Sequence, residues 1–164
     1  MSMIGKYRRI SPMQLADLIG DPDTVVDFLF DETEEPAMSN MLDIDKSWHA
    51  IHFLLNGDSW SGEGPSNYAV LGGTEIGEDV VGYGPARYLV PKQVSEASSA
   101  LAQISREALL FRFNLQRLRE AEIYPHGWEG STVEKEYIGY NYDRLISFFS
   151  EAAQSGDAML IYIS

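Results

Sequence analysis

The chain has 164 residues, of which 45% are hydrophobic and 23% charged; this composition excludes disorder along the whole length and suits one domain. Its longest uninterrupted apolar run, residues 158–163, is far shorter than the roughly 20 residues that a membrane-spanning helix needs. With 12 basic and 25 acidic residues, the formal charge is −13 and the pI about 4.5, which disfavours nucleic acid and favours a basic partner.

Cysteine is absent from the sequence. This excludes disulfide scaffolds, thiol nucleophiles, iron–sulfur clusters and cysteine-ligated zinc. The first ten residues lack the apolar stretch of about 7–15 residues, preceded by basic residues, that is typical of a secretory signal. We therefore expect a cytoplasmic protein that does not associate with a membrane.

A strand and two helices are predicted in the first part of the chain. Residues 3–10 are typical of a short strand. Ser11, Pro12 and Gln14 have the pattern of a capping box with proline in the first turn, so a helix should follow and end at Gly20. Residues 21–35 hold seven acidic and no basic residues among apolar ones. They favour a short amphipathic helix with a solvated acidic face, and they lack the alternating ligands and turn glycine of a calcium loop.

A stronger helix is predicted over residues 43–55. One face repeats apolar and aromatic side chains at intervals of three and four, and it contains Trp48, Ile51, His52 and Leu55. We expect Asp43 or Asp45 to cap the beginning of this helix, and Asn56 and Gly57 to end it.

The segment from Gly57 to Gly84 differs in composition, because it holds eight of the 14 glycines and no lysine or arginine. It predicts loops, with short strands at residues 68–71 and, beyond the segment, at 87–90. Loops carried by a scaffold often hold binding residues, so this segment indicates a functional surface. Its glycines lack the spacing of a phosphate-binding loop or a dinucleotide fingerprint, and we expect no cofactor.

The last part of the chain is mainly helical by its pattern. Helices are predicted from Pro91, from Ser105 and from Asn114. A capping box at residues 131–134 precedes a long helical pattern that Gly156 ends.

An uninterrupted apolar run at residues 158–163 closes the sequence. Such a run is typical of a strand that is buried on both faces, in the centre of a sheet. We expect this strand to pair with the one at residues 3–10. The resulting fold is a helix-rich α+β single domain over residues 1–164, with a small sheet that includes the N- and C-terminal strands.

His49 and His52 are the first candidate site residues. They lie three positions apart on the predicted helix, and Asp45 precedes His49 by one turn. Two imidazoles and a carboxylate at this spacing are potential metal ligands, although the pattern is not that of a His-Glu-x-x-His zinc site. We favour structural support beside Trp48, or an unspecified polar site, and predict no metal.

Two further groups carry side chains that suit ligand binding. Arg87 lies near Tyr83 in a region otherwise without bases, where an arginine clamps a carboxylate or phosphate or neutralises nearby acids. Residues 122–129 combine acidic, histidine and aromatic side chains, among them Glu122, Tyr124 and Trp128. This combination predicts either an acid–base pair or a packed aromatic corner.

Several sequence strings together resemble one known family. They are Met3-Ile4-Gly5 with Tyr7, Leu42 to His49, Gly82 to Pro91, Glu122-Ile123-Tyr124-Pro125, and the closing helix, glycine and strand. In this order, and over essentially the whole chain, they are similar to the YfbM-like family of bacterial proteins, a domain of unknown function. The resemblance implies a single cytoplasmic α+β domain, and it implies no reaction, cofactor or catalytic residue.

Two functions are compatible with these observations. The first is a non-enzymatic interaction module whose acidic surface binds a basic protein. The second is a small-ligand-binding protein or an enzyme with a pocket lined by His49, Tyr83, Arg87 and Glu122. We favour the first, because no nucleophile, metal or nucleotide motif accompanies the acidic composition; whether the protein is an enzyme stays open. A homodimer is compatible with both.

Overall fold

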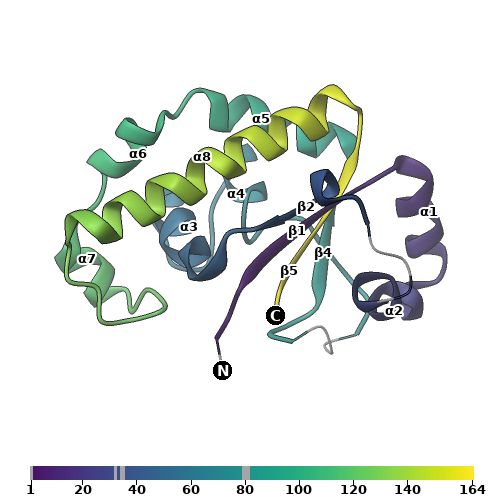
Figure 1. The fold of residues 1–164 in the computed structure, drawn as a ribbon, viewed down its shortest axis with the longest axis horizontal. Helices are drawn as coiled ribbons and strands as arrows, with labels where there is room; N and C mark the ends of the chain where they lie inside the picture. Colours follow the sequence, from purple (N-terminus) through teal and green to yellow (C-terminus); the bar gives the residue numbers. More distant parts are fainter. Residues whose placement is uncertain (1, 32, 34–35, 79–81) are drawn as a thin grey trace.

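A five-stranded antiparallel sheet with the order β2-β1-β5-β4-β3 forms the centre of the fold in the computed structural model (Figure 1). The structure describes residues 2–31, 33, 36–78 and 82–164. The strands are β1 (Gly5–Ile10), β2 (Met41–Asp43), β3 (Thr74–Ile76), β4 (Ala86–Leu89) and β5 (Ala158–Ile163).

Helices hold most of the residues in regular structure. They are α1 (Pro12–Gly20), α2 (Val25–Phe30), α3 (Trp48–Asn56), α4 (Pro65–Tyr68), α5 (Pro91–Ala102), α6 (Arg106–Phe111), α7 (Leu115–Glu120) and α8 (Thr132–Gln154). Short 3-10 turns are η1 (Pro22–Thr24), η2 (Met38–Asn40) and η3 (Asp45–Ser47). Within the described ranges, no helix combines the length and the apolar character needed to cross a membrane.

The last strand occupies the middle of the sheet, as its sequence predicts. All six residues of β5 are buried, and β5 pairs with β1 on one side and with β4 on the other. The pairing with β1 runs along both strands, from Gly5 opposite Ile163 to Ile10 opposite Ala158. The two ends of the sequence are therefore joined in the centre of the fold.

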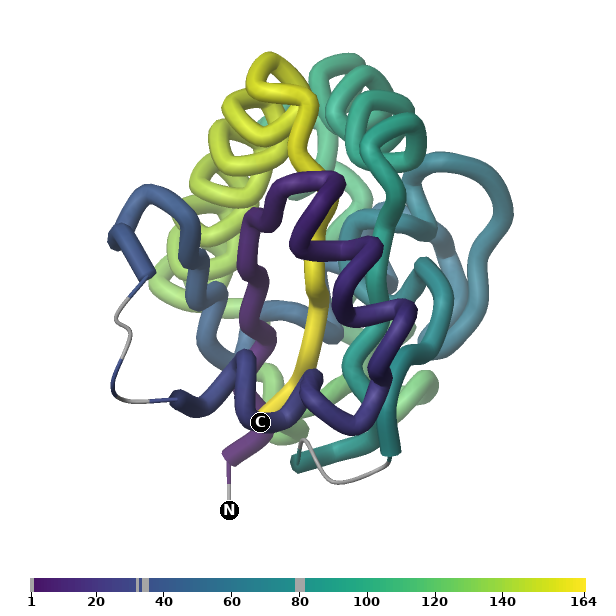
Figure 2. Tube along the Cα trace, turned by 90° about the vertical axis from the view of Figure 1, so that its right-hand side faces the viewer, coloured from purple at the N-terminus to yellow at the C-terminus, as the bar shows by residue number. Residues whose placement is uncertain are grey.

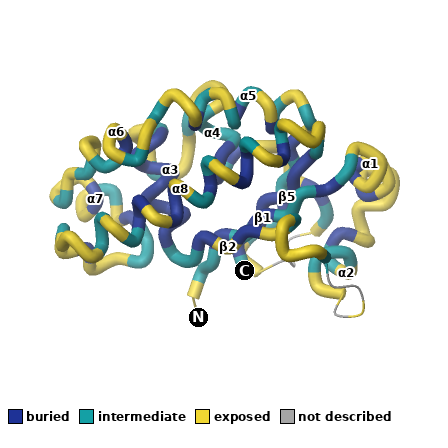
Figure 3. Tube along the Cα trace, turned by 45° about the horizontal axis from the view of Figure 1, so that its top comes forward, coloured by how far each residue is buried: buried dark blue, intermediate teal, exposed yellow. Residues whose placement is uncertain are grey.

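Two helical layers cover the two faces of the sheet, which explains why β5 is apolar at every position. Its side chains alternate between the faces. Met159, Ile161 and Ile163 belong to the larger core, which includes residues of α3, α5 and α8. Ala158, Leu160 and Tyr162 belong to a smaller core under α1 and α2. Figure 2 shows α1 and α2 in front of the sheet, with α5 and α8 behind it. In Figure 3 most of α1 is exposed, whereas β5 is buried and β1 is a mixture of buried and intermediate residues.

Local capping signals place the helix ends where the sequence predicts them. The capping boxes of Ser11 with Gln14 and of Ser131 with Glu134 are both formed. Asn114 caps α7 through the N–H of Arg117, and Gly57 ends α3 in a left-handed conformation. The acidic helix predicted within residues 21–35 is confirmed as η1 and α2; residues 32, 34 and 35 lie outside the described residues.

The beginning of the helix predicted at residues 43–55 is wrong. α3 begins at Trp48, because Asp45 has a positive φ of 52° and starts a 3-10 turn. Neither aspartate caps α3. The Asp43 side chain accepts the N–H of Asp45 at 2.7 Å, and Ser47 occupies the cap position without a side-chain hydrogen bond.

The short strand predicted at residues 68–71 is also wrong. Tyr68 ends α4, and the strand of this region is β3, which pairs with β4. Pro65 in the first turn of α4 explains the helix locally. The strand predicted at residues 87–90 is confirmed as β4.

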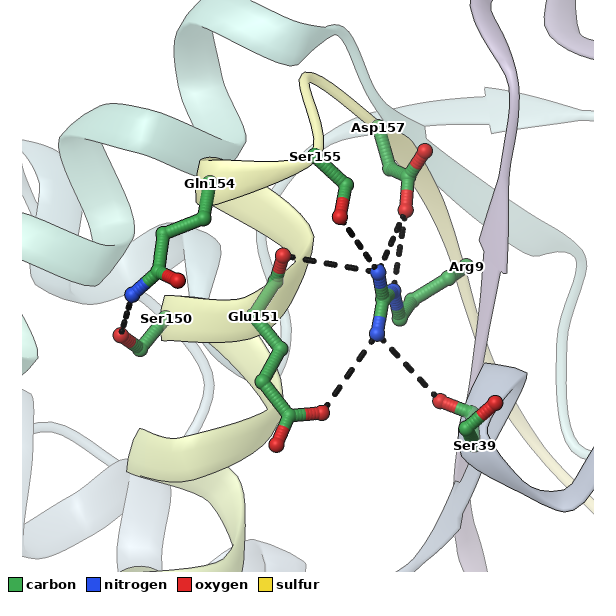
Figure 4. A network of polar contacts seen from close by, with 7 residues as sticks. All are labelled: Arg9, Ser39, Ser150, Glu151, Gln154, Ser155 and Asp157. Atoms are coloured by element: carbon green, nitrogen blue, oxygen red, sulfur yellow. Dashed lines mark hydrogen bonds and ion pairs between the residues drawn. The ribbon is translucent and has the colours of Figure 1, made fainter.

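A polar network joins β1 to the end of α8 and to η2 (Figure 4). The Arg9 guanidinium donates to Asp157 Oδ2 at 2.9 Å and to Ser155 Oγ at 3.0 Å. It also donates to the Ser39 carbonyl oxygen, and it forms an ion pair with Glu151 at 3.5 Å. With only 11% of its side chain exposed, Arg9 connects segments that are far apart in the sequence.

Candidate functional site

His49 is a buried residue of α3 whose two ring nitrogens both bind backbone groups. Its Nε2 lies 2.8 Å from the carbonyl oxygen of Ser59, and its Nδ1 accepts the N–H of Tyr124 at 2.9 Å. These partners assign the neutral tautomer with the proton on Nε2. Burial lowers the pKa of His49, and the hydrogen bond to Ser59 opposes this change only in part.

His52 has an equivalent role one turn later. Its Nε2 lies 3.1 Å from the carbonyl oxygen of Ser61, and its Nδ1 lies 3.3 Å from the side-chain nitrogen of Asn56. Burial lowers the pKa of His52 to about 4. The ring nitrogens of both histidines thus contact internal groups.

Together the two histidines hold the loop that follows α3. Ser59 and Ser61 lie on either side of Trp60, and the Asp58 carboxylate accepts the N–H groups of Trp60 and Ser61 at 2.9 Å each. These contacts hold the backbone of the loop, and the Trp60 side chain on it is 63% exposed.

An aromatic stack runs from this loop into the protein. The ring of Trp60 lies 4.5 Å from that of His49, and the His49 ring is stacked on Trp48 at 4.8 Å. The Trp48 ring also lies 5.8 Å from the ring of Tyr124 and 6.3 Å from that of Trp60. The structure thus brings together three of the predicted site residues, Trp48, His49 and Tyr124. Their rings pack against one another, and both ring nitrogens of His49 contact backbone groups.

The remaining predicted site residues near this stack also make internal contacts. The Tyr124 hydroxyl accepts the N–H of Met3, and Trp128 donates its indole N–H to the carbonyl oxygen of Ile123 at 3.0 Å. Glu122 and Trp128 line a shallow cavity of about 210 Å³ together with His126. Asp45 and Trp128 line a second cavity, beside α8.

Arg87 and Tyr83 line neither of these two cavities. Arg87 lies on β4, opposite Glu75 of β3, and donates to the carbonyl oxygen of Val70 at 3.0 Å. Burial lowers its pKa, which the nearby Tyr7 and Glu75 partly offset. Tyr83 lies beside the end of β5, where its N–H donates to the carbonyl oxygen of Ile163. The described contacts therefore do not unite His49, Tyr83, Arg87 and Glu122 around one cavity.

A different feature, an acidic groove between α1 and α2, has free functional groups. Its volume is about 340 Å³. The lining residues on each side recur at intervals of three or four positions, so one face of each helical segment lines the groove. The lining residues are Gln14, Asp17 and Leu18 from α1, and Thr24, Asp27, Phe28 and Asp31 from η1, α2 and the residue after α2.

The carboxylates that rim this acidic groove are exposed, whereas its floor consists of the buried Leu18 and the half-buried Phe28, whose ring lies 4.0 Å from the Arg8 guanidinium. Asp17, Asp27 and Asp31 form no ion pair with any other described residue. Hydrogen bonds from the hydroxyl and N–H of Thr33 lower the pKa of Asp31, which keeps this carboxylate charged at neutral pH. The groove is therefore a negatively charged surface feature with an apolar base.

Comparison with known proteins defines the family. A model of the domain of unknown function DUF1877 matches residues 1–162. The chain belongs to the DUF1877 family. It is 27% identical to the protein YfbM of Escherichia coli (strain K12), with 99% of each chain covered. It also matches the crystal structure of YfbM from Escherichia coli, a protein of unknown function, with a TM-score of 0.70 over 99% of this chain and 100% of the other. The resemblance found in the sequence is confirmed.

Two features of this DUF1877 domain were not predicted from its sequence. The acidic residues at positions 21–35 indicated a solvated helix, but not that α1 would supply the second wall of a groove. The second is the exposed Trp60, which belongs to no sequence motif. The aspartate two positions before Trp60 is a local signal for an ordered turn, since its side chain accepts backbone N–H groups there.

Proposed function

We propose that this DUF1877 domain is an interaction module rather than an enzyme, and that its acidic groove binds a cationic segment of a basic partner protein. The observation that carries the proposal is the groove itself, with three carboxylates free of ion pairs among the described residues over an apolar floor. Residues 11–45 hold ten of the 25 acidic residues and none of the 12 basic ones. This segment therefore carries a formal charge of −10.

Lysine and arginine side chains match both parts of the acidic groove. Their aliphatic stems suit the apolar floor of Leu18 and Phe28, and their charged heads suit the rim carboxylates of Asp17, Asp27 and Asp31. A negatively charged face also accelerates the approach of a basic partner and makes binding depend on salt. The fit is to a segment with several cationic side chains, because the groove has carboxylates on both walls.

The alternative, a ligand pocket lined by His49, Tyr83, Arg87 and Glu122, has weaker support. Both nitrogens of His49 bind backbone groups, and the guanidinium of Arg87 donates to a backbone carbonyl. His49 therefore has little capacity left for catalysis or for a ligand, and Arg87 lines none of the cavities described above. The cytoplasmic location stays a prediction from the sequence, and a homodimer is compatible with either function.

Fluorescence anisotropy with a labelled amphipathic lysine–leucine peptide tests the proposal. We expect saturable binding that weakens by roughly tenfold or more between about 20 mM and about 300 mM NaCl. The triple variant Asp17→Asn, Asp27→Asn, Asp31→Asn should weaken binding at low salt by at least as much, because it removes the rim charges and retains the shape.

A matched variant separates the acidic groove from the total charge of the protein. Glu63→Gln, Glu107→Gln and Glu129→Gln together remove the same three charges from exposed positions outside the groove. We expect this variant to bind the peptide nearly as well as the original protein. Equal losses in the two triple variants, or an affinity that salt does not change, would contradict the proposal.

A further inference from the structure

A second cavity, of about 350 Å³, lies at the other end of the molecule from α1 and α2 (Figure 1). The turn before α3, the turn at residues 125–128 and the first two turns of α8 surround it. Its lining residues are Asp45, Lys46, Pro125, His126, Trp128, Val133, Glu134 and Tyr137. We call it the α8 cavity. It shares no lining residue with the acidic groove, so an inference from it does not rest on the proposed function.

The walls of the α8 cavity are mainly apolar and firmly held. Trp128 is only 4% exposed, and its indole N–H bonds the carbonyl oxygen of Ile123. Arg119 donates twice to the carbonyl oxygen of Trp128, at 3.0 and 2.8 Å, which fixes the backbone of the turn. Val133, 78% exposed, lies in the first turn of α8. A volume of this size falls at the lower end of the range for small-molecule sites, roughly 300–1,000 Å³.

The Asp45 carboxylate in this cavity is held through one of its two oxygens. The Tyr137 hydroxyl donates to Asp45 Oδ2 at 2.7 Å, and it accepts the backbone N–H of Lys46 at 3.0 Å. The other oxygen of Asp45 has no hydrogen-bond partner among the described side chains and backbone groups in this structure. Lys46 also lines the cavity but forms no ion pair with Asp45.

The second carboxylate, Glu134, is already engaged. Its oxygens accept the N–H groups of Glu129 and Ser131 at 2.9–3.2 Å and complete the capping box of α8. Asp45 is therefore the available anion of the α8 cavity. An oriented carboxylate beside tryptophan and tyrosine rings is the arrangement that recognises an organic ammonium group.

We propose that the α8 cavity binds a small primary amine with an aromatic body. The ammonium group pairs with Asp45, and the aromatic body packs against Trp128, Pro125 and Val133. Tyr137 is a positioning residue, since its hydroxyl orients the carboxylate. A lysine side chain of another protein carries the same alkylammonium group. A free arylalkylamine differs from it by its aromatic body, so the two sources can be compared directly.

Isothermal titration calorimetry at low salt tests this site with three probes, which are phenethylamine, its neutral analogue 2-phenylethanol, and Nα-acetyl-lysine amide. We expect saturable binding of phenethylamine and binding at least tenfold weaker for the other two. Asp45→Asn should reduce the affinity for phenethylamine at least tenfold, because it removes the charge that recognises the ammonium.

Val133→Arg provides a variant that does not depend on the Asp45 turn. This exposed position tolerates a long side chain, and a positive charge at the cavity should repel the amine, so we expect a similar loss. Glu129→Gln, next to Trp128 but outside the lining, should leave the affinity unchanged. The proposal is overturned by equal binding of 2-phenylethanol, by tighter binding of the lysine amide, by full affinity in both site variants, or by no saturable binding at millimolar amine.

Discussion

At the scale of single residues, the two histidines show what a sequence pattern leaves open. Helical spacing places Trp48 and His52 on one face of α3, and the structure confirms that both are buried. The same spacing does not predict that the loop at residues 57–62 folds back against the two histidines. The carbonyl oxygens of this loop, and the distant N–H of Tyr124, determine the partners of the imidazoles.

The buried state of His52 makes the stability of the protein depend on pH. Its pKa is about 4 in the folded protein and about 6.5 when unfolded. Below pH 6.5 the His52 imidazole is protonated in the unfolded chain but stays neutral in the folded protein. The free energy of unfolding therefore falls as the pH decreases toward 4. We expect a loss of about 2 kcal/mol from this group between pH 7.5 and about pH 5, measured by urea unfolding.

His52→Gln separates this effect from the loss of packing. The variant should be less stable at pH 7.5, but its stability should change less with pH than that of the original protein, by about 2 kcal/mol. His126→Gln is the matched control, because His126 is exposed. An unchanged pH dependence in His52→Gln would show that this imidazole is not held neutral.

The need for a glycine at position 5 is a second feature that the sequence does not predict. Its strand is predicted correctly, yet nothing local explains a glycine there. A β-carbon at Gly5 would lie 2.8 Å from the Cβ of Trp48, closer than real contacts allow. The reason for the residue is thus a contact across 43 positions of the sequence, between β1 and the start of α3.

At the scale of elements, local signals predict best where a helix begins with a cap or a strand is apolar throughout. The capping boxes and the central strand β5 needed no knowledge of distant contacts. The errors at residues 43–47 and 68–71 have the opposite origin. A left-handed Asp45 and the pairing of β3 with β4 depend on neighbours from elsewhere in the chain.

The Arg9 network is an element-scale contact with a measurable energy. Arg9→Met should lower the free energy of unfolding by about 1–3 kcal/mol, because it removes hydrogen bonds to a charged group and leaves Asp157 partly buried without its cation. Urea unfolding at neutral pH measures this loss. Lys92→Met, which removes an exposed ion pair with Glu96, should cost less than about 0.5 kcal/mol. Equal effects would mean that the network adds little to the docking of α8 on β1.

At the scale of the whole molecule, several arginines bind backbone groups and not acidic side chains. Arg87, Arg112, Arg119 and Arg144 each donate to a backbone carbonyl oxygen. They fasten loops and helix ends instead of neutralising acids. The total charge of −13 can be read from the sequence, but only the fold shows that Asp17 of α1, Asp27 of α2 and Asp31 line one groove.

This grouping of carboxylates predicts that salt stabilises the protein. Repulsion among the Asp17, Asp27 and Asp31 carboxylates of the acidic groove opposes folding, and salt screens it over roughly 10 Å at 0.1 M. We expect Tm to rise by a few degrees between about 20 mM and about 300 mM NaCl, measured by differential scanning calorimetry. The triple variant of Asp17, Asp27 and Asp31 to asparagine should have a higher Tm at low salt, and its Tm should rise less with salt. The control variant, with Glu63, Glu107 and Glu129 changed to glutamine, should keep most of the salt-dependent rise in Tm. A Tm that falls with salt, or equal behaviour of the two variants, would mean that the acidic groove carries no concentrated repulsion. The groove would then lose the unbalanced charge on which its attraction for a basic partner depends.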